Sequence, residues 1–202
     1  LSVFHRYSAG QQVPARVLVA NVAGDTMATL VTGFCQQAWS VMPEYLQSTR
    51  VVCGVTNAYI NPAQLGVDRW LAIIAAWNKY RDYICIIDCG SAVTVDLVCA
   101  DGQHQGGYII PGSYMMQQSL LNSTGQIALA TGYHFSGQAG RSTDECVYNG
   151  TTYAIAAFIE YIMQSLNDSG QQTYHCVITG GGAEPIMKIL KIDFHREPML
   201  VM

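Results

Sequence analysis

Two kinds of apolar pattern alternate along this chain. Short apolar runs bounded by glycine, proline or aspartate are typical of buried strands, and apolar residues three or four positions apart are typical of helices. The first pattern predicts strands at 16–22, 49–55, 83–88, 92–100, 106–110, 174–179 and 199–202. The second predicts helices at 25–38, 66–80, 113–121, 142–167 and 184–190. Asp25 is the expected N-cap of the first helix, and Ser142 forms a capping box with Glu145 at the start of the longest.

The order of the predicted elements favours a layered α/β fold. Three consecutive strands between residues 83 and 110, the last two joined by the turn Asp101-Gly102, predict an antiparallel part in an otherwise mixed sheet. Two lobes are expected to meet near Gly66, with residues 1–65 as the remainder of an N-terminal lobe and residues 66–202 as the C-terminal lobe. The stretch 122–140 has no sustained periodicity, so a loop is expected there.

The charged residues disfavour two classes of partner. Lysine and arginine together number 10 against 14 aspartates and glutamates, which gives a formal net charge of -4, and the basic residues are scattered. Neither nucleic acid nor an anionic membrane surface is therefore an expected partner. No apolar run approaches the roughly 20 residues that a membrane-spanning helix needs.

The seven cysteines predict a reducing environment. They are odd in number, mostly lie inside apolar runs and include no C-x-x-C pair. Thiols used in this way, as small apolar side chains, are typical of a cytoplasmic protein rather than of a disulfide framework or a zinc site. The five histidines share no metal-ligand spacing.

The segment 88–91 could carry chemistry. Its strand ends in Asp88 and turns through a glycine and Ser91, so backbone amides and a hydroxyl can approach phosphate oxygens while the carboxylate holds a cation. The alternative is a tight hairpin that Asp88 merely caps. Thr94 and Asp96, further along the hairpin, are expected to serve its edge or turn hydrogen bonds.

Asp68 and Arg69 fall in the first turn of the helix predicted at 66–80. The helix macrodipole favours a carboxylate there, and a positioned carboxylate could accept a proton from a substrate hydroxyl. Arg69 could bind a substrate carboxylate or phosphate in a bidentate manner. From position alone, the commoner roles are an ordinary helix-start aspartate and a solvated surface arginine.

The glycine run 180–182 falls between a predicted strand and a predicted helix. Glycines at such a turn let the sugar or phosphates of a nucleotide approach backbone N–H groups. The run lacks the lysine of a P-loop and the G-x-G-x-x-G spacing, and a plain turn is the alternative. Ser142 and Thr143 are explained locally as helix caps.

Taken in order, five segments resemble a known family. They are NAYINPAQLGVDRW, DCGSAVTVD, GGYIIPG, GRSTDE and TGGGAE, and the resemblance extends from about Val51 to the C-terminus. The combination of G-V-D-R-W with D-x-G-S-A-x-T-x-D is much more specific than an isolated glycine loop. The set is similar to the bacterial type III pantothenate kinases, of the acetate and sugar kinase, heat-shock chaperone and actin superfamily. The resemblance implies a two-lobed actin-like (ribonuclease H-like) ATPase fold with mixed sheets flanked by helices.

The resemblance also implies roles for individual residues. Asp68 is the expected base that activates the pantothenate hydroxyl. Asp88 is expected at a monovalent cation, potassium or ammonium, and Ser91 at the phosphates of ATP. The other expected pantothenate contacts are Tyr59, Gly66, Val67, Arg69 and Thr143, the last reached from a neighbouring subunit. The residues expected near adenosine are Gly180 and Gly181.

The chain departs from the family pattern at two places. Family members carry an N-terminal strand pair with an Asp-x-Gly-Asn-Thr/Ser phosphate loop, which nothing in residues 1–13 matches. Either a truncated chain or a degenerate homologue, lacking one wall of the phosphate cradle, is therefore expected. Ser91 stands where the family usually has threonine, which keeps the hydroxyl.

The predicted function is the ATP-dependent phosphorylation of pantothenate to 4'-phosphopantothenate, the first step of coenzyme A biosynthesis. Mg²⁺ is expected to bind with ATP, and the resemblance implies a homodimer with sites at the interface. Two other classes stay open from the sequence. One is a non-catalytic transcriptional accessory or interaction protein. The other is a sugar or acetate kinase of the same superfamily, which the contexts of Asp68 and Asp88 disfavour.

Overall fold

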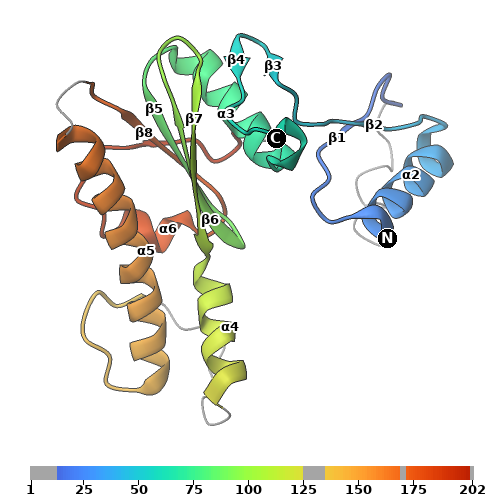
Figure 1. Cartoon of the computed structure of the whole chain (residues 1–202). Coiled ribbons are helices and arrows are strands. Elements are labelled where there is room, and N and C mark those ends of the chain that lie inside the picture. The colour runs from blue at the N-terminus through green and yellow to red at the C-terminus, as the bar shows by residue number, and fades with distance from the viewer. Residues whose placement is uncertain (1–12, 125–134, 169–171, 201–202) are drawn as a thin grey trace.

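A five-stranded mixed sheet forms the centre of the computed structural model, which describes residues 13–124, 135–168 and 172–200 (Figure 1). Its strands are β5 (Ile84–Cys89), β6 (Ala92–Val98), β7 (His104–Pro111), β8 (His175–Thr179) and β9 (His195–Arg196). They lie in the order β7-β6-β5-β8-β9; the first three are antiparallel, and β8 and β9 run parallel to β5. This arrangement, with the first strand central, is that of ribonuclease H-like ATPases and confirms the expected fold class.

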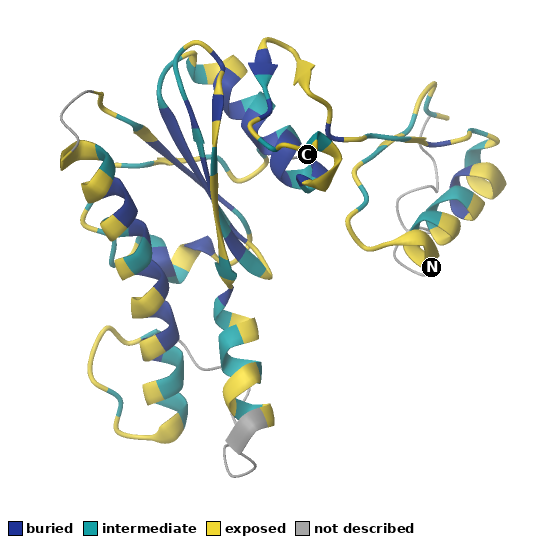
Figure 2. Ribbon diagram, viewed as in Figure 1, coloured by how far each residue is buried: buried dark blue, intermediate teal, exposed yellow. Residues whose placement is uncertain are grey.

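Helices cover both faces of this sheet: α3 (Val67–Tyr80) lies on one face, and α5 (Thr143–Asp168) and α6 (Ala183–Met187) lie on the other. Two further helices, α2 (Asp25–Trp39) and α4 (Ser113–Thr124), lie away from these faces (Figure 1), and a 3-10 turn is present at Pro62–Gln64. Because strand side chains alternate, Ile84 and Ile86 of β5 pack on α3, whereas Cys85 and Ile87 pack on α5 and α6. Figure 2 shows the buried sides of α3 and α5 turned toward the sheet. The sheet is therefore the middle of three layers.

The N-terminal elements lie beside this body (Figure 1). Strands β1 (Leu18–Val19) and β2 (Glu44–Tyr45) pair in parallel beside α2. The hairpin of β3 (Val51–Val52) and β4 (Val55–Thr56) packs on α3, where Val55 is fully buried. This hairpin precedes Gly66, so residues on both sides of the expected lobe boundary contribute to one core.

Three predictions about these elements were wrong. The strand expected at 49–55 is a hairpin, because Cys53 and Gly54 take positive φ angles of 51° and 82° and reverse the chain between the valines. The N-cap of α2 is Gly24, not Asp25, which is the first helical residue. The final strand lies at β9, whereas residues 199–200 form a turn and 201–202 lie outside the described residues.

The other predicted elements agree with the structure to within a few residues. The capping box is present, since Ser142 Oγ accepts a hydrogen bond from Glu145 N at 3.2 Å. Of the expected loop at 122–140, residues 125–134 lie outside the described part of the chain, as do residues 1–12. No helix in the part that is described is both long and apolar enough to cross a membrane.

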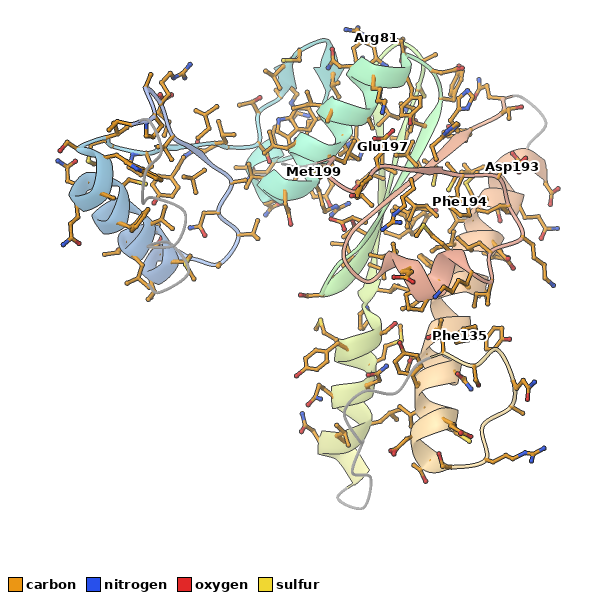
Figure 3. All side chains as sticks on the ribbon, turned by 180° about the vertical axis from the view of Figure 1, so that it is seen from behind. Arg81, Phe135, Asp193, Phe194, Glu197 and Met199 are labelled. Carbon is orange, nitrogen blue, oxygen red and sulfur yellow. The ribbon has the colours of Figure 1, made fainter. Side chains whose placement is uncertain are left out.

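The segment after β9 is fastened to the end of α3 (Figure 3). Glu197 accepts a hydrogen bond from Tyr80 Oη at 2.7 Å and is also bonded to Lys79 Nζ. Burial, together with this carboxylate, raises the pKa of Tyr80 to about 12. Leu200 packs on the core between α3 and the sheet. The position of α3 therefore depends on residues far along the chain.

Candidate active site

The turn between β5 and β6 is where three strand ends meet. Ser91 O accepts a hydrogen bond from Gly112 N, after β7, at 2.9 Å, and Cys89 O accepts one from Gly182 N, after β8, at 2.8 Å. A Cβ on Gly112 would lie 2.5 Å from the backbone oxygen of Ser91, so glycine is required for this approach. Ser91 itself stays exposed, and its hydroxyl is available to a phosphate oxygen.

A cavity of about 480 Å³ opens beside this turn. Its walls include Ser91 of the turn, Tyr114 of α4, Tyr148 of α5 and Gly181 after β8. The volume lies within the range of small-molecule and cofactor sites, roughly 300–1,000 Å³. Two residues predicted to contact ATP, from distant parts of the sequence, thus line one cavity.

Gly180 brings the end of β8 against Asp88. Its φ is 94°, and a Cβ there would lie 2.5 Å from both Asp88 Oδ1 and Cys89 O. A side chain at this position would force the two strand ends apart. Gly181, by contrast, has no atom within 4 Å of an added Cβ and is open to the cavity.

Three carboxylates gather on the α3 side of the sheet. Strand alternation and register put Asp88 and Asp96 on the same face as Ile86, and this face meets the start of α3, which carries Asp68. Burial, with the charges of Asp68 and then Asp96, raises the pKa of Asp88. Gly66 makes room for the Asp68 carboxylate, since an added Cβ would lie 2.6 Å from its Oδ1.

Only one of these carboxylates has an ion-pair partner within the described residues. Asp96 is paired with Arg69, whereas the ion pairs of the described chain include neither Asp68 nor Asp88. The site therefore keeps uncompensated negative charge, which suits a cation. No group of three or more His, Cys, Asp or Glu side chains among the described residues could hold a metal alone. A cation at Asp88 would need further oxygen ligands, such as those of ATP.

Arg69 is not the surface group that its position suggested. It is 7% exposed, and its Nε and Nη2 donate to Asp96 Oδ2 and Oδ1 at 2.9 and 2.6 Å. Its Nη1 donates to Tyr59 Oη at 3.0 Å. Burial lowers the pKa of Arg69, but the bonds and charge of Asp96 and Tyr59 outweigh this and raise it above its usual value. The guanidinium fork expected to bind a substrate anion is thus occupied by Asp96.

Asp96 was missed as a site residue, and its expected role in the hairpin edge was wrong. Its exposed fraction is 2%, and its carboxylate faces α3 rather than a turn. The sequence could have indicated this role, because Asp96 is a charged residue at the centre of the apolar strand 92–98. Strand alternation also puts it on the same face as Asp88 of the preceding strand. Such a residue is rarely buried unless it is paired.

The residues predicted to contact pantothenate divide into two groups. Tyr59, Gly66, Val67 and Arg69 come together around the start of α3, where Gly66 and Val67 also line a cavity of about 380 Å³. Thr143 does not join them within this chain. It is the exposed first residue of α5, on the arm that α4 and α5 form beyond the sheet (Figure 1).

A ribonuclease H-like sheet is combined here with an exposed turn beside a nucleotide-sized cavity, and with carboxylates that lack an ion-pair partner at the end of β5 and the start of α3. This combination is typical of an actin-like phosphotransferase. A family model described as type III pantothenate kinase matches residues 2–165. The chain belongs to the type III pantothenate kinase family, as its five segments predicted.

Individual relatives agree with this assignment. A type III pantothenate kinase from Nitrosococcus oceani is 36% identical over 93% of this chain and 72% of the relative. One from Alcanivorax borkumensis is 35% identical over 94% of this chain and 77% of the relative. Among solved structures, a conserved protein of the Baf family of transcriptional activators from Campylobacter jejuni covers 98% of this chain and 82% of its own, with a TM-score of 0.57. At 17% identity that likeness bears on the fold alone, so it lends no support to the regulatory alternative.

The raised pKa of Asp88 predicts a cost in stability. Above that pKa the folded protein must hold a buried charge, so its stability falls as pH rises through the pKa. Asp88→Asn should therefore raise Tm at neutral pH by roughly 2–4 °C, the shift expected for about 1 kcal/mol in a domain of this size. The difference should vanish in acid, where Asp88 is protonated in the folded and unfolded states. Calorimetry of the ligand-free protein from about pH 2.5 to pH 8 measures it, because an unfolded aspartate is fully protonated only well below pH 4.

The control for this prediction is Asp101→Asn. Asp101 lies on an exposed turn, where its Oδ1 accepts a bond from Gln103 N at 3.0 Å that an amide oxygen can replace. Its Tm should follow the wild type at every pH. A lower Tm for Asp88→Asn than for the wild type at neutral pH would contradict the proposed charge penalty.

Proposed function

We propose that this chain transfers the γ-phosphoryl group of ATP to the 4'-hydroxyl of pantothenate, with Asp68 as the base. One observation carries the proposal: Asp68 and Asp88 lie close together on the α3 face of the sheet. The end of β5, which carries Asp88, also bounds the 480 Å³ cavity. Family membership supports pantothenate as the substrate, and the geometry supports the division into a donor side and an acceptor side.

ATP is proposed to occupy the cavity between Ser91 and Gly181. The Ser91 hydroxyl and the exposed backbone of its turn bind the phosphates, and Gly181 admits the adenosine side without an obstructing side chain. Gly180, also expected near adenosine, contributes by letting the end of β8 approach Asp88. Bound with ATP, Mg²⁺ neutralises phosphate charge. Asp88 holds a monovalent cation, because its burial beside two other carboxylates leaves a charge to be balanced.

The acceptor is proposed to bind at the start of α3. Gly66, Val67, Arg69 and Tyr59 bound this region, and the backbone N of Arg69 holds Asp68 Oδ1 at 2.8 Å. The 4'-oxygen of pantothenate forms a bond to the γ-phosphorus as the bond to the β–γ bridging oxygen breaks, and its proton passes to Asp68. Catalysis then rests on positioning and charge, as in other phosphoryl transfers.

A homodimer completes the proposal, with Thr143 reaching the acceptor of the partner. An apolar groove of about 680 Å³ runs between α4 and α5, lined by residues such as Met115, Val147 and Ala154. The α4–α5 arm also exposes Tyr114 and Tyr153, at 68% and 45%. Large apolar side chains gathered beside such a groove suit an isologous contact with a second copy.

Two broader expectations are part of the same proposal. The division into residues 1–65 and 66–202 is kept for the lobes, although β3 and β4 pack on α3. A cytoplasmic location follows from the use of cysteine, and the seven cysteines, all within the described ranges, are free thiols.

Asp68→Asn should lower kcat by about 10²–10⁴, because an amide cannot accept the hydroxyl proton. KM for ATP should change little, since Asp68 does not line the ATP cavity. The assay follows ADP release by the full-length protein with pantothenate and potassium present. Asp101→Asn is the control and should keep wild-type kcat. Undiminished turnover by Asp68→Asn would remove it as the base.

Asp88→Ala should abolish activation by monovalent cations, because the ion loses its charged ligand. The measurement is kcat against potassium or ammonium concentration, with sodium added to hold the ionic strength constant. Wild-type activity should rise with the cation and then saturate, and the variant should give a flat response. An unaltered cation dependence would show that the ion binds elsewhere.

Mixing two inactive variants tests the shared site. Asp68→Asn and Thr143→Ala homodimers should each be impaired, but subunit exchange creates one site with both side chains intact. Random exchange should restore roughly a quarter of wild-type activity, since half of the dimers are mixed and each has one good site. Activity that stays at the sum of the two variants after exchange would contradict a site shared between subunits.

A further inference from the structure

Asp96 has no part in the transfer step, yet its carboxylate lies at the centre of a buried network. Its Oδ2 accepts from Arg69 Nε at 2.9 Å, and its Oδ1 accepts from Arg69 Nη2 at 2.6 Å. The same Oδ1 is 3.1 Å from His104 Nε2. Side chains of Arg69 and Asp96 are 7% and 3% exposed, and that of His104 is 0% exposed. Solvent therefore has little access to any of the three.

This network ends at the hydroxyl of Tyr59. Two nitrogens of Arg69 donate hydrogen bonds to Asp96, and the third, Nη1, donates to Tyr59 Oη at 3.0 Å. A phenol that accepts at its oxygen still has its own proton to donate. Because Arg69 occupies one side of that oxygen, the Tyr59 proton is directed away from it. Tyr59 can thus donate to an oxygen of the acceptor.

His104 supports the same tyrosine from a second direction. Its ring stacks on that of Tyr59, with centroids 6.3 Å apart and planes 13° apart. Its Nδ1 accepts from Ala58 N at 3.4 Å, so the proton of a neutral ring is on Nε2, which donates to Asp96. His104 thereby ties Asp96 to the backbone that precedes Tyr59.

The neighbouring strand β7 packs closely against the Asp96 carboxylate. Gly107 of β7 stands opposite Asp96 in the sheet register. A Cβ on Gly107 would lie 2.8 Å from Asp96 Oδ1 and 1.9 Å from Val95 O. The position of the Asp96 carboxylate is consequently fixed by the sheet. Asp96 in turn orients Arg69, and Arg69 orients the Tyr59 hydroxyl.

We propose that Asp96 and His104 are positioning residues of the acceptor site, which act through Arg69 to aim the Tyr59 hydroxyl at an oxygen of the acceptor substrate. The inference rests on the proposed function, in which Tyr59 contacts pantothenate. Neither residue touches the substrate or the transferred group. Their loss affects acceptor binding and leaves ATP binding intact.

The main test replaces the ion pair with the double variant Asp96→Leu/Arg69→Met in the full-length protein. Apolar residues of similar volume often substitute for a buried ion pair without loss of the fold. KM for pantothenate should rise at least about tenfold, and KM for ATP should stay within about twofold. Addition of Tyr59→Phe should raise the pantothenate KM no further, because the pair acts through that hydroxyl.

The matched control is Arg16→Met/Glu44→Leu. Arg16 and Glu44 form a bidentate pair with the same chemistry, at 2.8 and 2.7 Å, on the exposed N-terminal segment. Both KM values of this variant should equal those of the wild type. A wild-type pantothenate KM in the folded Asp96→Leu/Arg69→Met protein, an equal rise in the KM for ATP, or an additive effect of Tyr59→Phe overturns the positioning role.

His104→Phe decides the question if the pair replacement does not fold. It keeps the ion pair and an aromatic ring, but removes the hydrogen bonds to Asp96 and Ala58. A raised pantothenate KM with unchanged ATP KM supports the proposal, and wild-type values overturn it. The proposed function fails separately, when the wild-type protein itself phosphorylates no pantothenate.

Discussion

The ion pair of Arg69 and Asp96 joins the start of α3 to the middle of β6, and the acceptor half of the site is arranged around it. The pair is buried and bidentate, and loss of one partner from such a pair typically costs about 3–5 kcal/mol. Tyr59 is bonded to the arginine, and the backbone of Arg69 holds Asp68. One contact that holds a helix on a sheet thus also orders Asp68 and Tyr59, the proposed base and a proposed substrate contact.

Charge is divided unequally among the three aspartates. Asp96 is neutralised within the protein, whereas Asp68 and Asp88 have no ion-pair partner in the described chain. Burial raises the pKa of Asp88, and buried carboxyl groups with a perturbed pKa gather at functional sites. The protein thus has a local cost in stability at Asp88 in its ligand-free state, which the proposed cation would remove. The same carboxylate that lowers the stability of the ligand-free protein is the one proposed to hold the cation.

Much of the fold could be predicted because apolar periodicity reports local burial. The helix α3 and the strands β5, β6 and β7 followed from pattern. Family resemblance singled out Ser91 and Gly181, which line one cavity, and their contact with ATP stays a prediction. The chain reversal at Cys53 could not be predicted, because the valines on both sides of it have the pattern of one continuous strand. From position alone, Arg69 was expected at the surface and Asp96 in the hydrogen bonds of the hairpin, because periodicity identifies a residue's face and not its partner across layers. Thr143 is a different case: its proposed role requires a second chain.

Strand β5 can pair with its second neighbour, β8, only late in the synthesis of the chain. It pairs with β6 immediately, but its other edge waits for β8, which is made only after α4 and α5. During synthesis, at about 5–20 residues per second, the central strand is an apolar ribbon with an open edge, the form most prone to wrong pairing. The ends of β5 and β8 also bound the 480 Å³ cavity beside Ser91. A nascent chain therefore has no complete cavity until β8 is in place, and a ligand that binds there cannot assist the earlier stages of its folding.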